Sequence, residues 1–144
     1  MFETPMQNVG HVLTLLVTVC VFLRPAQGAK TVAVANLVAY VVTPLVQNRI
    51  NLESPQWAIL GVDLTLLALI TWVLMRERDL WLQITWGAMA LTTLLHVAKA
   101  LDPTLFVRGY IGSLYVVYFA FLAGLAASLI PAARRARPGP EGVA

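Results

Sequence analysis

The sequence predicts an all-α membrane protein, a polytopic transmembrane helical bundle with five spans. Hydrophobic residues make up 59% of the 144 residues and charged residues only 12%, about half of the charged fraction in soluble domains. The mean hydropathy is +0.77, and five apolar stretches alternate with short polar segments. Such a composition cannot cover a water-facing surface, so we expect the helices to lie in a bilayer.

The predicted spans are 6–23, 31–46, 56–75, 80–98 and 110–130. The last three each contain about 20 residues, the length that crosses a hydrocarbon core of about 30 Å. The first two are shorter, and Pro44 removes a backbone donor near the end of the second, so we expect that helix to fray or tilt. In an alternative arrangement, the first two segments form a re-entrant hairpin and only three segments span. Uncovered backbone turns within lipid make that arrangement energetically expensive.

Boundary residues support the division into helices. Pro25 and Gly28 separate the first two segments, and Asp102 with Pro103 forces a turn between the last two. Asp79 directly precedes the fourth segment and is placed to cap it. These signals support three of the four connections between the apolar segments.

Positive charges predict the orientation of the bundle. A cleaved signal peptide carries its positive residues before the apolar stretch, whereas here Glu3 precedes it and Arg24 and Lys30 follow, so we predict a retained first helix. Seven Lys and Arg residues fall on one side of the five-span arrangement and three on the other. The side with seven is predicted to be cytoplasmic, which places the N-terminus outside and the C-terminus in the cytoplasm. We expect the bacterial cytoplasmic (inner) membrane.

Residues 1–131 are therefore predicted to form one transmembrane helical domain, followed by a basic cytoplasmic tail, 132–144, that we expect to be disordered. In this tail, Arg134, Arg135 and Arg137 are candidates for binding anionic lipid headgroups, although a role in orientation also explains them. The net charge of +3 is spread over helix ends, so no nucleic-acid partner is expected. The predicted partners are the lipid bilayer and other membrane-protein subunits or further copies of the chain.

Asp63 is the most informative single residue because it stands in an apolar run without a charged neighbour in sequence. It lies about 10 Å below the boundary of its span, a depth at which a lone charge costs several kcal/mol. His96 and Lys99 share one face of the fourth segment, with Thr92 one turn further in. Since neighbouring spans joined by a short connection are antiparallel, these side chains are plausible partners for Asp63.

His11, near the outer end of the first segment, completes the predicted polar intramembrane cluster. Such a cluster can act as a proton relay or an outward-opening ligand pocket, because histidine titrates near neutral pH. It can equally be a structural contact that fixes the register of the helices, which is the more common role of polar groups between membrane helices. The sequence favours the structural role.

Cofactor signals are weak in this chain. His11 and His96 could supply two axial nitrogens to a haem, but nothing else in the sequence marks a haem pocket. We predict no metal site, since Cys20 is the single cysteine and no short ligand spacing occurs. No cofactor is required by the sequence, and no catalytic motif is present, so an enzyme is not expected.

The fifth segment carries small residues at four-residue steps, Ala120, Gly124 and Ser128. Such a stripe lets another helix approach closely. We expect it to be a packing face, and packing within the chain is the favoured role because four other helices also need a neighbour.

Three functions agree with these observations. The first is an accessory or interaction subunit of a larger membrane complex. This function is favoured because the residues supply all the chemistry that it needs. The second is an oligomeric channel or transporter with an outward-facing polar site around Asp63, His96 and Lys99, since five short helices scarcely enclose a pathway alone. The third is a haem- or quinone-binding redox protein.

Overall fold

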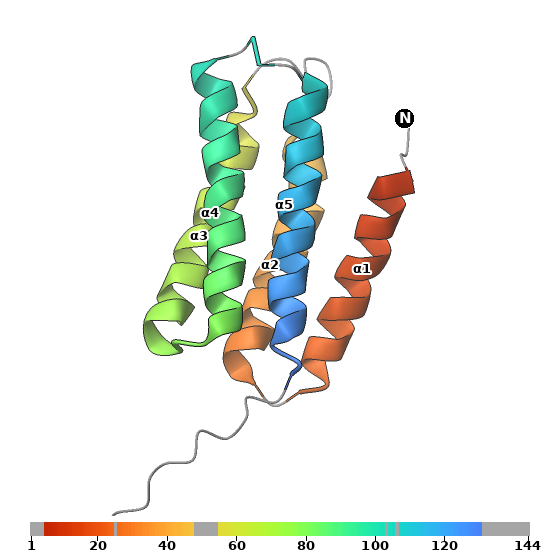
Figure 1. The fold of residues 1–144 in the computed structure, drawn as a ribbon, viewed down its shortest axis with the longest axis vertical. Coiled ribbons are helices and arrows are strands. Elements are labelled where there is room, and N and C mark those ends of the chain that lie inside the picture. Colours follow the sequence, from red (N-terminus) through yellow and green to blue (C-terminus); the bar gives the residue numbers. More distant parts are fainter. Residues whose placement is uncertain (1–4, 25, 48–54, 103, 106, 131–144) are drawn as a thin grey trace, which may run out of the picture.

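In a computed structural model, the chain folds into five α-helices (Figure 1). The structure describes residues 5–24, 26–47, 55–102, 104–105 and 107–130. Helices make up 87% of these residues and no strand occurs among them, so the all-α fold class is confirmed. The helices are α1 (Pro5–Phe22), α2 (Gln27–Val46), α3 (Trp57–Arg76), α4 (Leu80–Leu101) and α5 (Val107–Ala127).

Four of these helices, α2 to α5, are long and apolar enough to cross a membrane. The apolar stretch found in α1, Asn8–Phe22, is shorter than a full span. The protein is therefore a multi-pass integral membrane protein. A fifth crossing by α1 stays a prediction, because the length and composition of that helix do not establish it.

The helix ends differ in detail from the predicted segments. α2 begins at Gln27, before the predicted span, and includes Gly28 in its first turn, where backbone N–H groups need no partner within the helix. Pro44 lies in the last turn of α2, and the helix continues past it. Asp79 occupies the N-cap position of α4 but makes no side-chain cap, because its carboxylate accepts a hydrogen bond from Trp81 Nε1 at 3.3 Å.

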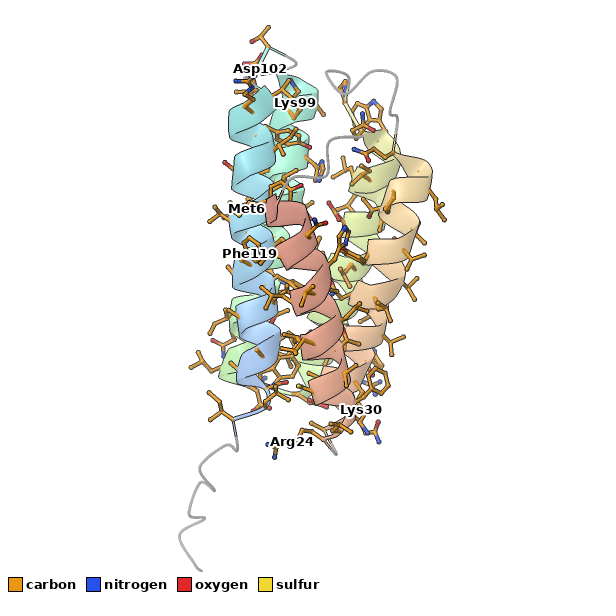
Figure 2. The ribbon with its side chains drawn as sticks, turned by 90° about the vertical axis from the view of Figure 1, so that its right-hand side faces the viewer. Met6, Arg24, Lys30, Lys99, Asp102 and Phe119 are labelled. Atoms are coloured by element: carbon orange, nitrogen blue, oxygen red, sulfur yellow. The ribbon has the colours of Figure 1, made fainter. Side chains whose placement is uncertain are left out.

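The helices form a ring in which each packs against the next and α1 closes against α5 (Figure 1). The interface between α4 and α5 is the most extensive. Arg24 and Lys30 lie at one end of the bundle, and Lys99 and Asp102 at the other (Figure 2). We call these the basic end and the distal end.

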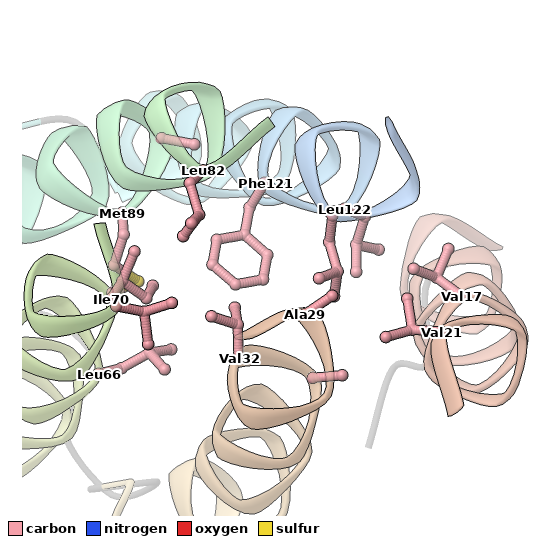
Figure 3. Packing of buried hydrophobic residues seen from close by; sticks show 14 of the residues in the cluster. Val17, Val21, Ala29, Val32, Leu66, Ile70, Leu82, Met89, Phe121 and Leu122 are labelled. Atoms are coloured by element: carbon pink, nitrogen blue, oxygen red, sulfur yellow. The ribbon is translucent and has the colours of Figure 1, made fainter. Parts of the chain in front are cut away.

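An apolar core fills the half of the bundle next to the basic end. The ring of Phe121 lies in its middle, with Leu82 of α4 and Val32 of α2 on either side (Figure 3). All five helices contribute side chains to this core: Val17, Val21, Ala29, Val32, Ala33, Leu66, Ile70, Val73, Leu82, Ala88, Met89, Val117, Phe121, Leu122 and Leu125. The buried charged groups lie instead in the distal half, which therefore contains the candidate site.

Candidate polar site in the distal half

Asp63, His96 and Tyr110 form a polar contact between three helices. His96 is buried on α4, and its Nε2 lies 3.1 Å from Oδ2 of Asp63 on α3. Its other ring nitrogen, Nδ1, lies 2.6 Å from the hydroxyl oxygen of Tyr110 on α5. The His96 and Tyr110 rings also meet edge to face, with centroids 5.6 Å apart. We call these three residues the distal triad, and it ties α3, α4 and α5 together.

The contact between His96 and Asp63 is close but not aligned as a straight hydrogen bond. A separation of 3.1 Å is normal for an N–H···O bond. Nevertheless, Oδ2 of Asp63 is buried and receives no well-aligned hydrogen bond from any group that the structure describes. The buried carboxylate therefore depends on the facing imidazole for compensation.

The distal triad admits two proton arrangements. In the first, the imidazole is neutral, Tyr110 donates to Nδ1, and the N–H at Nε2 faces Asp63. In the second, the imidazole is charged, both ring nitrogens carry protons, and Tyr110 accepts from Nδ1. Neither ring nitrogen loses its partner between the two, so the site can hold one additional proton without breaking a contact.

Lys99 lies beside the triad under the connection between α4 and α5. Its side chain is only 2% exposed, and its Nζ donates a hydrogen bond of 2.9 Å to the carbonyl oxygen of Leu105. Thr92 uses its hydroxyl within its own helix, where it donates to the carbonyl of Ala88 at 3.2 Å. Asp63 pairs with His96, and Lys99 and Thr92 each donate a hydrogen bond to a backbone carbonyl oxygen.

His11 belongs to a different group of side chains. It packs edge to face against Tyr40 of α2, with ring centroids 5.3 Å apart, and Tyr40 stacks on Tyr118 of α5. The structure therefore places His11 between α1 and α2 rather than in the distal triad. Axial ligation of a haem by His96 would have to replace its contact with either Asp63 or Tyr110, because both ring nitrogens already face oxygens.

A directed hydrogen-bond chain links α2, α5 and α1 beside His11. Thr14 donates to the carbonyl of Gly10 at 2.7 Å, so the Tyr118 hydroxyl, 2.8 Å away, must be the donor to Thr14. Asn36 in turn donates to the Tyr118 oxygen across a longer 3.5 Å. The Thr18 hydroxyl, one turn further along α1, is buried without a partner among the described groups.

The small residues of α5 have unequal roles. Gly124 is buried against α4, and a Cβ there would lie 2.6 Å from Oγ1 of Thr85. Ala120 is exposed, and Ser128 lies beyond the last residue of α5 and donates to the carbonyl of Leu125. Close approach of α4 and α5 therefore rests on Gly124. The predicted headgroup residues Arg134, Arg135 and Arg137, like the whole tail 132–144, lie outside the described residues.

Two contributors to these contacts were missed by sequence reasoning. Tyr110 was not among the residues predicted for the polar cluster, although its place at the start of the fifth segment brings it level with His96. Asn36 is an amide inside an apolar run, which is the same signal that singled out Asp63.

No known protein-family model matches this chain, and no curated protein or solved structure is significantly similar to it.

Proposed function

We propose that this protein is an accessory or interaction subunit of a larger membrane complex, oriented with its basic end toward the cytoplasm of a bacterium. The observation that carries the proposal is the closed interior. Apolar side chains from all five helices fill the half next to the basic end, and the buried charges of the other half face partners within the chain. This filled interior favours a function at the outer surface of the bundle over passage of a solute through a single chain.

The lipid-facing side of α4 and α5 supports this proposal. A groove of about 510 Å³ lies there, lined by Leu91, Leu95, Gly109, Gly112, Ser113, Val116 and Val117. A Cβ at Gly112 would meet no atom within 4 Å. Small side chains at such a position let a second helix come close, and close packing is the main source of helix association in lipid.

Copurification tests the proposal. The protein is extracted from its native membrane in a mild detergent and its mass is measured by native mass spectrometry. We expect a stoichiometric complex with another membrane protein, which is lost when Gly112→Leu and Ser113→Leu fill the groove. The matched control Ala68→Leu changes an exposed residue of α3 and should leave the complex intact. A monomer alone in the native extract contradicts the proposal.

The distal triad favours one second candidate, an oligomeric channel or transporter that handles protons. Its support is the geometry of the distal triad, in which buried Asp63 and His96 and half-buried Tyr110 from three helices can share protons. In proteoliposomes, Asp63→Asn should then abolish a proton flux that the unchanged protein carries. Equal flux from the two proteins would remove this candidate.

A further inference from the structure

A second groove, of about 730 Å³, runs between α2 and α3. We propose that it binds an acyl chain of an anionic phospholipid whose phosphate pairs with Lys30. The groove is lined by Phe22, Gln27, Lys30, Thr31, Val34, Ala35, Val38, Ala39, Val42, Val62, Thr65, Leu66 and Leu69. This site is separate from the α4–α5 groove and does not depend on the proposed accessory role.

The dimensions of the groove fit a lipid acyl chain. Its lining on α2 extends from Gln27 to Val42, which is about 22 Å along the helix axis. Spread over that length, 730 Å³ corresponds to a mean cross-section of about 33 Å², so the groove is long and narrow. A half-bilayer is about 15 Å thick, so the groove is long enough for a whole chain of one leaflet.

The walls of the groove are apolar along most of its length. Val34 and Val38 are exposed on the α2 side, and the small side chains of Ala35 and Ala39 leave the space between them and α3 open. Leu69 lines the α3 side. A gap in packing forfeits dispersion energy. An acyl chain in this space would supply the contacts that the two helices do not make with each other.

The polar end of the groove selects the headgroup. Gln27, Lys30 and Thr31 lie there, and the Thr31 hydroxyl already donates to the carbonyl of Gln27 at 3.0 Å. Lys30 is half-buried, which suits a side chain whose stem lies along apolar surface while its ammonium reaches the boundary. Arg24 lies at the same end of the bundle (Figure 2), so the local charge favours an anion.

Glu77 is an acidic side chain that reaches the same end. Its carboxylate lies against Gly28 in the first turn of α2, where an added Cβ would meet it. It is not one of the residues that line the groove, but its charge weakens the attraction for a phosphate. Loss of the Lys30 charge should therefore weaken binding of the phosphate, whereas loss of the Glu77 charge should strengthen it.

Native mass spectrometry of the full chain released from nanodiscs tests the site. The nanodiscs contain phosphatidylglycerol and phosphatidylcholine in equal amounts, and the readout is the ratio of the two lipids retained by the protein. We expect an excess of phosphatidylglycerol. Lys30→Gln should lower that excess about five-fold, the contribution of one basic residue near a membrane surface. Lys30→Arg should preserve the excess, and Glu77→Gln should raise it.

Two further variants separate the groove from the charge. Ala39→Leu fills the groove and should reduce retention of both lipids, whereas Ala123→Leu, at an exposed position of α5, should not. Arg108→Gln removes an exposed positive charge at the distal end and should leave the ratio unchanged. Equal retention of the two lipids by the unchanged protein, or an unchanged ratio in Lys30→Gln, overturns the proposal. A dimer that Ala39→Leu dissolves would also overturn it, because a second copy would then occupy the groove.

Discussion

His96 and Asp63 bring a ring nitrogen and a carboxylate oxygen to 3.1 Å across the interface between α3 and α4. Both side chains are buried, and the imidazole is held from its other side by Tyr110. An isolated carboxylate at this depth in a membrane is costly. The stability of the bundle should therefore depend on the two residues as a pair rather than on either alone.

The pair should behave non-additively on substitution. His96→Leu leaves a buried carboxylate without its facing imidazole and should lower the free energy of unfolding by about 1–3 kcal/mol. Adding Asp63→Leu in the same chain should recover much of that loss, because an apolar pair replaces a buried polar one. Unfolding in mixed micelles by a rising fraction of dodecyl sulfate measures each variant. Losses that simply add in the double variant would show that the two groups act independently.

Thr14 and Thr18 offer a matched test of the second polar group. Thr14→Val removes the acceptor of the Tyr118 hydroxyl and should lower the free energy of unfolding by about 1 kcal/mol. Thr18→Val removes a buried hydroxyl that has no partner among the described groups, so it should be neutral or stabilise the protein by up to about 1 kcal/mol. The same unfolding titration measures both. Equal losses in the two variants would contradict the assigned hydrogen bonds.

Much of the fold followed from the sequence because composition and the length of apolar runs determine how many helices form. His96 could be named as a partner for Asp63 since antiparallel helices joined by a short connection bring matching ends together. The rotation of each helix about its own axis was harder to predict. Every helix here is apolar on nearly all sides, so periodicity gives little information on which face is buried.

Two residues illustrate this limit. Ala120 and Gly124 follow the same four-residue spacing, yet Ala120 is exposed and Gly124 is buried. The sequence predicts that His11 lies at the same end of the bundle as His96. In the structure, His11 packs on Tyr40 because α1 lies next to α2 and α5 in the ring. The order of helices around the ring decides such contacts, and hydropathy does not encode that order.

Gly124 should be sensitive to a single added methyl group. A Cβ at this position would lie 2.6 Å from Oγ1 and 3.0 Å from the backbone nitrogen of Thr85. Because a backbone atom cannot rotate away, Gly124→Ala should push α5 from α4 and lower the free energy of unfolding by about 1–3 kcal/mol. The control Gly112→Ala meets no atom within 4 Å and should be neutral or slightly stabilising, as alanine favours a helix by up to about 1 kcal/mol. Similar effects of the two variants would rule out a tight α4–α5 contact.

Asp102, just past the end of α4, should change its pKa when Thr104 is altered. The Thr104 hydroxyl and then its backbone N–H donate to the carboxylate and lower the Asp102 pKa from its ordinary value of 3.8, with a smaller contribution from the charge of Lys99. Because the pKa is lowered, the ionised carboxylate of Asp102 stabilises this turn at pH values above 3.8. That stabilisation disappears as the pH falls through the lowered pKa.

Thr104→Val removes the largest of these contributions, so the Asp102 pKa should rise toward 3.8. Thr104→Ser keeps the hydroxyl and should leave the pKa low. A carboxyl-carbon NMR titration of the protein in micelles resolves the two variants, with no change expected in the helical content. If Thr104→Val titrated at the same pH as the unchanged protein, the backbone N–H alone would hold the carboxylate, and the hydroxyl contact would have no electrostatic role.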